Sequence, residues 1–532
     1  MTPPSGRPRG HVFVTVANIN HLQVDAWLLP TDRYLSITPK WEIADHEVEV
    51  LRAADSLQAF RAGTVLAAPW PESPQGPLPD GPQGPLRVLT AVPPRGARDF
   101  SDLQERLEAG LRMAAEAARA RRNDGRLPLI ATPAFGVSGG GANRRRADVI
   151  AGILRTADLV AHEEGVDVVV CLWKRVDYAL AQHIRRAQWK SQRPLETALW
   201  DRAVTLAEHT RKGDLVPFMG AGVSATAGLP TWAELLQKLQ ITGKEIPDGW
   251  LKDLGSLDIA TILESKYPNP ARFTKEVARL VRSDRYGLAP ALLANLPGTS
   301  AVTLNYDRLY EAAWSDAWHD TTKPLRVLPW DSLKPSEPWL LKLHGDVGRP
   351  KSIILTRSQY LDFAVRQRGL ASLAKALLMT KHLLFVGFGL SDDHFHEIVH
   401  EVRGIRPEPK RSGTTPARSG TALVLGDGGI HAAVWGNDFD IVPFSTTDAT
   451  PDHVVAGRKL EIFLDVMVGL SGSDEPFTLD PRFQDAVDDR TLQSATRLSA
   501  AYEQLVEEQL GDTSPARRLR QLLLEFGYRG PT

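Results

Sequence analysis

A glycine-rich run is the part of this sequence whose residue types and spacing point most directly to chemistry. It reads GAGVSATAGLPTW at residues 220–232 and follows the apolar segment 215–219. A buried strand that ends in a glycine-rich turn and leads into a helix directs backbone N–H groups at an anion, most naturally a pyrophosphate. The spacing differs from the dinucleotide-binding pattern G-x-G-x-x-G, because the third glycine comes only at Gly228 and Pro230 follows. The run therefore predicts a phosphate-binding loop of a less common kind.

Three later segments also place polar residues where a strand should end. They read TLNYD at 303–307, LHGD at 343–346 and VGFGLSD at 386–392. Together with the glycine-rich run, and in the same order, they resemble the cofactor loop, the T-x-N-x-D segment, the HG motif and the G-x-S-like loop of the sirtuin superfamily. Members of that family use NAD as a reagent and break it. We therefore interpret residues 195–470 as a sirtuin-like NAD-binding domain.

The resemblance implies a role for individual residues. Asn305 would orient the ribose or the attacking water, because its amide can donate and accept at once. Asp307 would hold the nicotinamide ribose or carboxamide, and His344 would be a general base with a pKa near the working pH. These three are the expected catalytic residues. The expected cofactor-binding residues are Gly220, Ala221, Gly222, Ser224, Gly228, Thr303, Gly387, Gly389 and Ser391.

Outside this motif context the same residues have plainer interpretations. Asn and Asp are favoured in turns after strands, so Asn305 and Asp307 would need no catalytic role. His344 could equally be a core histidine that is hydrogen-bonded to the backbone. The catalytic assignment therefore depends on the four motifs occurring together.

The chain departs from the sirtuin deacylases in ways that bear on the substrate. It has one cysteine, Cys171, and so cannot form the four-cysteine zinc module that helps build their peptide cleft. Fewer than forty residues separate His344 from the strand expected at Leu383, and Thr231-Trp232-Ala233 stands where sirtuins continue with Asp-Phe-Arg. We expect an NAD glycohydrolase that releases nicotinamide and ADP-ribose, with NAD as substrate and no metal. Whether NAD is hydrolysed or cyclised stays open.

Other functions remain as alternatives. An NAD-dependent protein deacylase would make NAD loss depend on an acylated peptide, and a nucleotide-binding sensor would bind NAD without turnover. The run His396-Glu397-x-x-His400 matches H-E-x-x-H, in which two histidines on one helix face bind zinc. It lacks a third ligand at metzincin spacing, because the glycine falls one place late, at 404. Whether this run binds metal also stays open.

The first part of the chain alternates strand and helix signals. Helices are expected from Ser101 and over 147–164, and such alternation predicts an α/β fold with a parallel or mixed sheet. Strands are expected at 11–16, 26–29, 87–92, 127–130 and 166–172.

Two segments of this part resemble the macrodomain family, which binds ADP-ribose. They read VDAWLLPTD at 24–32, where the family normally has an asparagine near the end, and TPAFGVSGGG at 132–141. The resemblance implies a macrodomain-like domain over residues 1–185 with an ADP-ribose-like nucleotide as ligand. A structural α/β domain with a flexible loop is the alternative.

The second domain shows a doubly wound, Rossmann-type pattern with ligands expected at the carboxyl ends of its strands. Residues 471–532 form a helical C-terminal extension with an amphipathic pattern from about 480 to 527, and the stretches 69–86 and 403–420 are predicted loops. Strands are expected at 215–219, 300–304, 340–343, 352–355, 383–387, 421–425 and 438–444.

Bulk properties exclude some functions. The 532 residues carry a formal net charge of −1, which gives no reason to expect nucleic-acid or membrane-surface binding. No apolar stretch is long enough for a membrane helix, and the first residues lack the apolar core of a signal peptide. A single cysteine permits no internal disulfide and fits a reducing compartment. We expect a cytoplasmic protein with no membrane or nucleic-acid partner.

The resemblance also implies a biological role. Relatives with such a reduced sirtuin-like domain recur among bacterial antiphage defence effectors that deplete cellular NAD. An effector of this kind must be silent until it is triggered. We therefore expect a homo-oligomer, control by the N-terminal domain or by oligomerisation, and a phage or host protein as the trigger.

Overall fold

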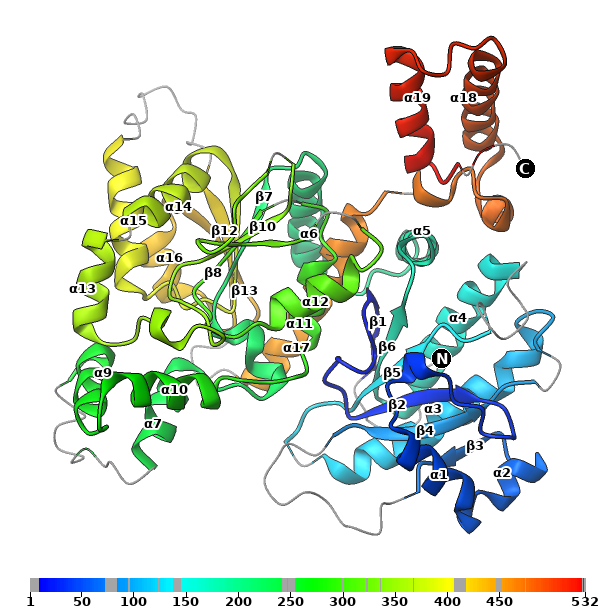
Figure 1. The fold of residues 1–532 in the computed structure, drawn as a ribbon, viewed down its shortest axis with the longest axis horizontal. Coiled ribbons are helices and arrows are strands. Elements are labelled where there is room, and N and C mark those ends of the chain that lie inside the picture. The colour runs from blue at the N-terminus through cyan, green and yellow to red at the C-terminus, as the bar shows by residue number, and fades with distance from the viewer. Residues whose placement is uncertain are drawn as a thin grey trace. The chain divides into compact units, whose positions relative to one another are not determined.

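The computed structural model divides the chain into two compact units, residues 1–194 with 472–532 and residues 195–471 (Figure 1). Each unit is described by itself. The structure describes residues 9–528 and 530, apart from 72–83, 94–95, 123, 137–144, 242–245, 247–253, 299, 322–323, 335, 367, 406–417, 446–451 and 474. Residues 137–141 of the expected N-terminal phosphate loop, most of the 69–86 loop and most of the basic 403–420 loop therefore lie outside the described residues.

The first unit contains a six-stranded sheet in the order β1-β6-β5-β2-β4-β3, in which only β3 at the edge is antiparallel. The strands are short apolar runs buried on both faces, as parallel strands between helices must be. Their bounds are β1 Val12–Val16, β2 Ala26–Thr31, β3 Ala67–Pro69, β4 Leu86–Ala91, β5 Leu129–Pro133 and β6 Asp167–Leu172. The five strands predicted from the sequence are all present, which confirms the α/β class of this part.

Helices α3 (Ser101–Arg121), α4 (Arg146–Glu164) and α5 (Arg175–Trp189) pack on this sheet, and α1 (Asp45–Ala53) and α2 (Gln58–Ala62) precede β3. Helix α3 buries Leu103, Leu107 and Leu111, which recur every four residues and so share one face. In β6, Cys171 is buried, and burial raises the pKa of its thiol, as expected for an unreactive core residue.

The C-terminal segment is helical, as predicted. Short 3-10 helices η6 (Glu475–Phe477) and η7 (Pro481–Ala486) pack on α5 and α4. A helical hairpin follows, formed by α18 (Asp489–Glu507) and α19 (Ser514–Glu525) around buried Tyr502 and Leu523 (Figure 1).

The second unit contains a seven-stranded sheet in the order β13-β12-β11-β7-β8-β10-β9, and every pairing in it is parallel. Its bounds are β7 Leu215–Met219, β8 Ser300–Thr303, β9 Arg326–Leu328, β10 Trp339–Lys342, β11 His382–Val386, β12 Gly420–Val424 and β13 Phe439–Pro443. The doubly wound prediction is confirmed, although β9 was not anticipated from the sequence.

One predicted strand is wrong. Pro350–Ser352 forms the 3-10 helix η5, and residues 353–355 continue as a buried loop. The Ile354 N–H donates to the His344 carbonyl at 3.0 Å, and the Ile354 carbonyl accepts from the Tyr306 hydroxyl at 2.7 Å. The backbone of this apolar run is therefore used to hold two other loops and not to extend the sheet.

Helices cover both faces of the second sheet (Figure 1). Pro217 in β7 faces the side covered by α6 (Thr197–Arg211), α11 (Leu288–Ala294), α12 (Leu309–Ala317) and α17 (His453–Ser471). Its neighbour Phe218 lies in the core with α14 (Arg368–Thr380), α15 (Asp393–Ile405) and α16 (Gly429–Trp435), because successive strand residues point to opposite faces.

A further helical group is inserted between β7 and β8. It comprises α7 (Trp232–Ile241), α9 (Ser256–Ser265) and α10 (Pro270–Leu280), which pack around fully buried Leu239 and Phe273. Helix α13 (Arg357–Arg366), which follows the 353–355 loop, contacts α9.

The strand order determines where a ligand can bind. From β7 the chain passes to β8 on one side and returns to β11 on the other, so the loops after β7 and β11 diverge. In open α/β sheets the binding crevice lies at such a switch point, beyond the carboxyl ends of the strands.

Among the described residues, no helix is sufficiently long and apolar to cross a bilayer.

Candidate active site

A cavity of about 460 Å³ opens at the carboxyl ends of β7, β8, β10 and β11. Its volume falls in the range of about 300–1,000 Å³ that is usual for small-molecule sites. The helices α7 and α9 contribute Trp232, Leu235 and Leu257 to its wall. The predicted site residues that line it are Gly220, Ala221, Ser224, Asn305, Asp307, His344, Gly387, Gly389 and Ser391.

The glycine-rich loop is held by close contact with the loop after β11. The Gly222 N–H donates to the Gly387 carbonyl at 2.9 Å, and a Cβ on Gly222 would lie 2.8 Å from the Gly387 Cα. Gly387 itself has φ +59°, and a Cβ there would lie 2.4 Å from the Val223 nitrogen. Only residues without a side chain allow these two loops to cross.

Gly222, Gly228 and Thr303 were predicted to bind the cofactor but do not line the cavity. Gly228 ends the 3-10 helix η4 (Ala221–Ala227) in a left-handed conformation. The Thr303 hydroxyl donates to the Met219 carbonyl and accepts from the Asn305 N–H, at 3.1 and 3.0 Å. These residues shape the loops and do not face the ligand space.

Ser224 links the two predicted polar residues that follow β8. Its hydroxyl donates to the Asp307 carboxylate at 2.8 Å and accepts from the Asn305 amide at 3.3 Å. The Asn305 amide nitrogen also donates to the Gly220 carbonyl at 3.0 Å. Both amide hydrogens are thus directed at the protein, and the Asn305 side-chain oxygen is left for a ligand.

Buried charges below the cavity hold the same loop. The Lys342 ammonium, at the end of β10, bonds to the Asp346 and Glu311 carboxylates, each at 2.9 Å, and to the carbonyls of Tyr306 and Asp307. Burial lowers the pKa of Lys342, but the neighbouring carboxylates outweigh it and leave that pKa above its usual value. Lys342 is therefore charged and ties the β8 loop to β10.

His344 lies directly after β10 and is only 3% exposed. Burial lowers its pKa to about 4; the Asp392 carboxylate opposes this effect and His394 adds to it. The expectation of a pKa near the working pH is wrong, because the ring is desolvated. At neutral pH the imidazole is uncharged and has a lone pair with which to accept a proton.

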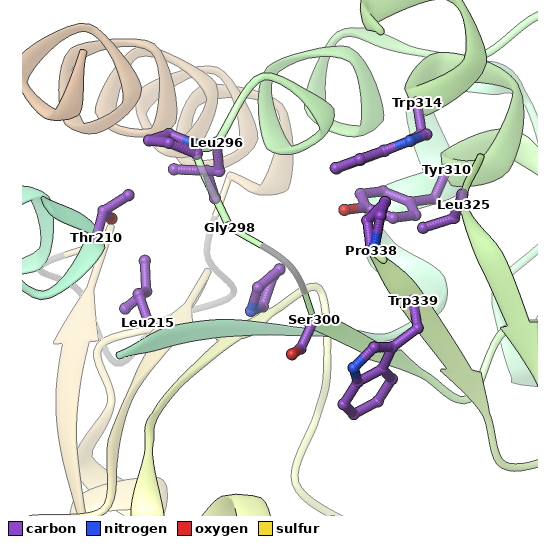
Figure 2. A pocket seen from close by; sticks show the side chains of 12 residues that line it. Thr210, Leu215, Leu296, Gly298, Ser300, Tyr310, Trp314, Leu325, Pro338 and Trp339 are labelled. Carbon is purple, nitrogen blue, oxygen red and sulfur yellow. The ribbon is translucent and has the colours of Figure 1, made fainter. Parts of the chain in front are cut away.

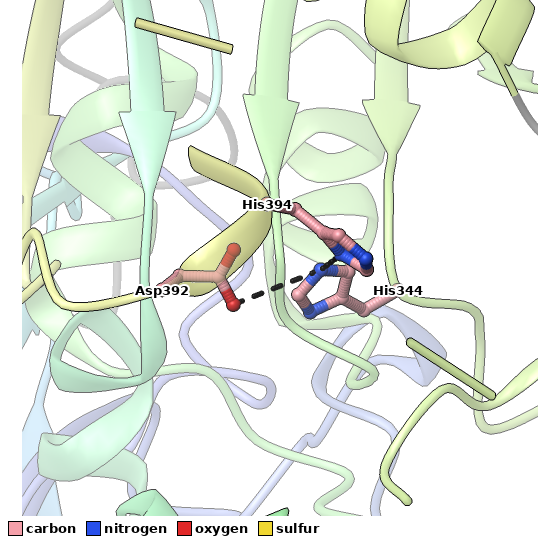
Figure 3. A group of neighbouring side chains, drawn as sticks. All are labelled: His344, Asp392 and His394. Carbon is pink, nitrogen blue, oxygen red and sulfur yellow. Dashed lines mark hydrogen bonds and ion pairs between the residues drawn. The ribbon is translucent and has the colours of Figure 1, made fainter. Parts of the chain in front are cut away.

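Sequence reasoning missed the residues around His344. The His344 Nδ1 lies 3.4 Å from the Tyr360 hydroxyl, and its Nε2 lies 3.3 Å from the His394 Nδ1 and 3.9 Å from an Asp392 carboxylate oxygen (Figure 3). Asp392 follows the recognised Ser391 in the sequence. No motif in the sequence around Tyr360 or His394 indicates a role in the site, because each residue is brought to His344 by the packing of its helix.

The H-E-x-x-H run does not form a metal site with a third ligand in the part of the chain that the structure describes. It lies on α15, where His396 and His400 are exposed, and the His396 Nε2 lies 2.8 Å from the Leu390 carbonyl. The geometry therefore gives no support to a zinc site at the H-E-x-x-H run.

A second hollow lies at the opposite, amino-terminal end of the strands. Leu215, Ser300 and Trp339, each at the start of its strand, line it together with Tyr310 and Trp314 (Figure 2). Its volume of about 10 Å³ leaves room for no more than a water molecule. The ligand-sized space is thus at the end of the sheet that carries the predicted motifs.

Part of the chain that holds this site matches a known family of domains. Residues 299–426 match the family of SIR2-like domains, and they include Asn305, Asp307, His344 and Gly387. An Enterococcus faecium protein named "NAD(+) hydrolase ThsA" is 26% identical over 213 residues, which cover 38% of this chain and 43% of that protein. A Bacillus subtilis protein named "Defense-associated sirtuin 2" is 24% identical over 236 residues, 38% of this chain and 20% of that protein.

This chain thus spans less than half the length of these two relatives. Among solved structures, the Oceanobacillus iheyensis macrodomain with MES bound is 15% identical to this chain. The match covers 35% of this chain and 96% of the macrodomain chain, with a TM-score of 0.26. The presence of a sirtuin-like domain, predicted from the motifs, is confirmed.

Proposed function

We propose that the SIR2-like domain of this chain hydrolyses NAD to nicotinamide and ADP-ribose. The observation that carries the proposal is that Asn305, Asp307 and His344, from two different strand ends, line one ligand-sized cavity together with the glycine-rich loop. The name of the Enterococcus relative, an NAD(+) hydrolase, supports the same reaction.

In this proposal the pyrophosphate lies against backbone amides. In the first turn of η4, the Gly222 and Val223 N–H groups donate to the Gly387 and Gly220 carbonyls, so the Ala221 N–H at the cavity wall takes the pyrophosphate contact in this proposal. Gly389 and Ser391 lie on the same wall, on the loop after β11. Ser224, whose hydroxyl is engaged by Asp307 and Asn305, positions these residues and does not bind phosphate directly.

Cleavage breaks the bond between the nicotinamide nitrogen and the ribose, and the bonding electrons leave with nicotinamide. The sugar becomes positively charged in the transition state, and the Asp307 carboxylate and the Asn305 oxygen place negative potential near it. Water then forms the new bond to the ribose carbon and loses a proton. The uncharged His344 accepts that proton, directly or through a ribose hydroxyl.

The proposed reaction needs no acylated peptide. Purified full-length protein should release nicotinamide and ADP-ribose from NAD alone, and His344→Ala and Asn305→Ala should each lower the rate by about 100-fold or more. A rate that depends on an added acyl-peptide would instead establish a deacylase. Binding of NAD without turnover would indicate either a missing activator or a sensor, and added nucleotides and partner proteins would then separate these two outcomes.

We further propose that the protein is a cytoplasmic antiphage effector that depletes NAD. The printed name of the Bacillus relative, a defense-associated sirtuin, supports a defence role. In this view the domain at residues 1–185 binds an ADP-ribose-like nucleotide. This domain, or assembly into a homo-oligomer, keeps the SIR2-like domain inactive until a phage or host protein triggers it. Adding ADP-ribose to the full-length protein should change the rate of NAD loss, and an unchanged rate with no binding would contradict this control.

A further inference from the structure

Three metal-ligating side chains converge at the back of the cavity. They are His344 after β10, Asp392 after β11 and His394 in the first turn of α15 (Figure 3). One nitrogen of each imidazole and one carboxylate oxygen all lie within 4.8 Å of one another.

The separations between these atoms suit a common cation. Ligand nitrogens about 2.0 Å from a tetrahedral zinc ion lie about 3.3 Å from each other. The His344 Nε2 and the His394 Nδ1 are 3.3 Å apart. The Asp392 oxygen is 3.9 Å from the same His344 nitrogen, so a small rotation of the carboxylate brings it to the ligand distance.

The contacts on the other nitrogens of the two imidazoles also favour a metal site. The His394 Nε2 lies 2.9 Å from the Tyr360 carbonyl, which can only accept, so Nε2 carries the hydrogen and Nδ1 presents a lone pair toward His344. The Tyr360 hydroxyl donates to Asp392 at 2.7 Å and is the neighbour of the other His344 nitrogen. Metal-binding histidines typically have such a carbonyl or hydroxyl on the nitrogen that faces away from the metal.

Burial and access distinguish this cluster from surface groups that gather by chance. His344 and His394 are 3% and 7% exposed, while His344 and Asp392 also line the cavity. Three protein ligands with one side open to a cavity is the arrangement of an accessible metal site. Two imidazoles and one carboxylate form a donor set that suits zinc, cobalt or nickel better than magnesium or calcium.

We propose that His344, His394 and Asp392 bind a divalent transition metal of the zinc class. We also propose, resting on the proposed NAD hydrolysis, that the bound metal blocks that reaction. An imidazole nitrogen that holds a metal has no lone pair left to accept a proton, and the ion itself would occupy the space beside the cavity.

The binding part is tested on the full-length, chelator-treated protein by titration with zinc in a calorimeter and by X-ray absorption at the zinc edge. One equivalent should bind, with imidazole nitrogens at about 2.0 Å. His394→Gln and Asp392→Asn should each weaken binding by at least about tenfold. The matched control is His400→Ala, which removes an exposed histidine of the same helix and should bind zinc like the wild type.

Three results would overturn the site. They are no stoichiometric zinc on the wild type, wild-type affinity in both variants, or loss of binding in His400→Ala. Circular dichroism of each variant identifies one that has failed to fold. The X-ray absorption spectrum of the zinc-loaded wild type identifies the ligand atoms without any variant.

The blocking part is tested by NAD turnover with increasing zinc. Turnover of the wild type and of His400→Ala should fall with the same midpoint as zinc binding and return when a chelator is added. Turnover that persists on the zinc-loaded protein, or that a chelator abolishes, would overturn the blocking role. Absence of NAD turnover under every condition would refute the proposed function, while the binding result would stand by itself.

Discussion

The Ser224 hydroxyl donates a hydrogen bond of 2.8 Å to the Asp307 carboxylate, across 83 residues of sequence. This bond joins the glycine-rich loop after β7 to the loop after β8. Since Ser224 also accepts from Asn305, one buried hydroxyl positions both polar residues that face the cavity from this side. The geometry of the site therefore depends on a residue that need not touch NAD.

Replacing Ser224 with alanine should lower kcat more than it changes KM. The substitution leaves one Asp307 oxygen without its donor and removes one of the two acceptors that hold the Asn305 amide. Mispositioned catalytic groups slow the chemical step. We expect a loss of roughly 10–100-fold in kcat, with about 1–3 kcal/mol of stability. Steady-state NAD kinetics measures this, and Ser224→Thr, which keeps the hydroxyl, should recover part of the rate. A rise in KM alone would instead indicate direct contact with substrate.

Replacing Lys342 with methionine should destabilise the SIR2-like domain strongly. The change removes the cation that Glu311 and Asp346 share. Asp346 keeps its ion pair with Arg308, but Glu311 loses its Lys342 partner at a buried position. Breaking a buried ion pair in this way typically costs about 3–5 kcal/mol. Denaturant unfolding checks the value. The exposed Lys351→Met is the control and should stay within about 0.5 kcal/mol of the wild type. Equal effects of the two substitutions would show that the Lys342 network adds nothing.

Acidification should weaken the second unit through His382. Burial lowers the pKa of this ring to about 4, and the nearby His209 adds to the effect. Between pH 6.5 and 4 the unfolded chain takes up a proton that the folded chain does not. Stability is therefore unaffected by this group above pH 6.5 and falls as the pH decreases from 6.5 toward 4, by at most roughly 3 kcal/mol.

The pH effect is measured as the thermal midpoint at a series of pH values. His382→Gln should show a smaller loss between pH 6.5 and 5 than the wild type, whereas His400→Gln, at an exposed position, should follow the wild type. Identical pH profiles for all three proteins would mean that His382 is not a buried neutral ring.

Replacing Gly387 with alanine should disrupt the close contact between the glycine-rich loop after β7 and the loop after β11. The new Cβ would lie 2.4 Å from the Val223 nitrogen, at a residue whose φ of +59° disfavours a side chain. We expect weaker NAD binding and a lower melting temperature. Gly369→Ala is the control, since nothing lies within 4 Å of its added Cβ and its φ is unstrained, so it should be neutral or slightly stabilising. NAD binding at wild-type affinity in Gly387→Ala would show that the loops can separate without loss.

The sequence by itself indicated most of the strands and the residues at their ends, although it missed β3 and β9. Runs such as Leu215–Met219 and residues 383–386 are apolar throughout, as strands buried on both faces must be. Because carboxyl ends of parallel strands meet at one edge of a sheet, the order of the motifs also predicted that Asn305, Asp307 and His344 would share a cavity. Periodicity does not specify hydrogen-bond partners, so the buried loop at 353–355 was mistaken for a strand.

Only the tertiary structure decided how the site residues are coupled. His344 and His394 are 50 residues apart, and their contact exists because α15 packs its first turn against the loop after β10. The low pKa of His344 likewise comes from desolvation by groups that fold over it. Local sequence determines propensity and burial pattern, whereas the distance between two side chains from separate elements depends on how those elements pack.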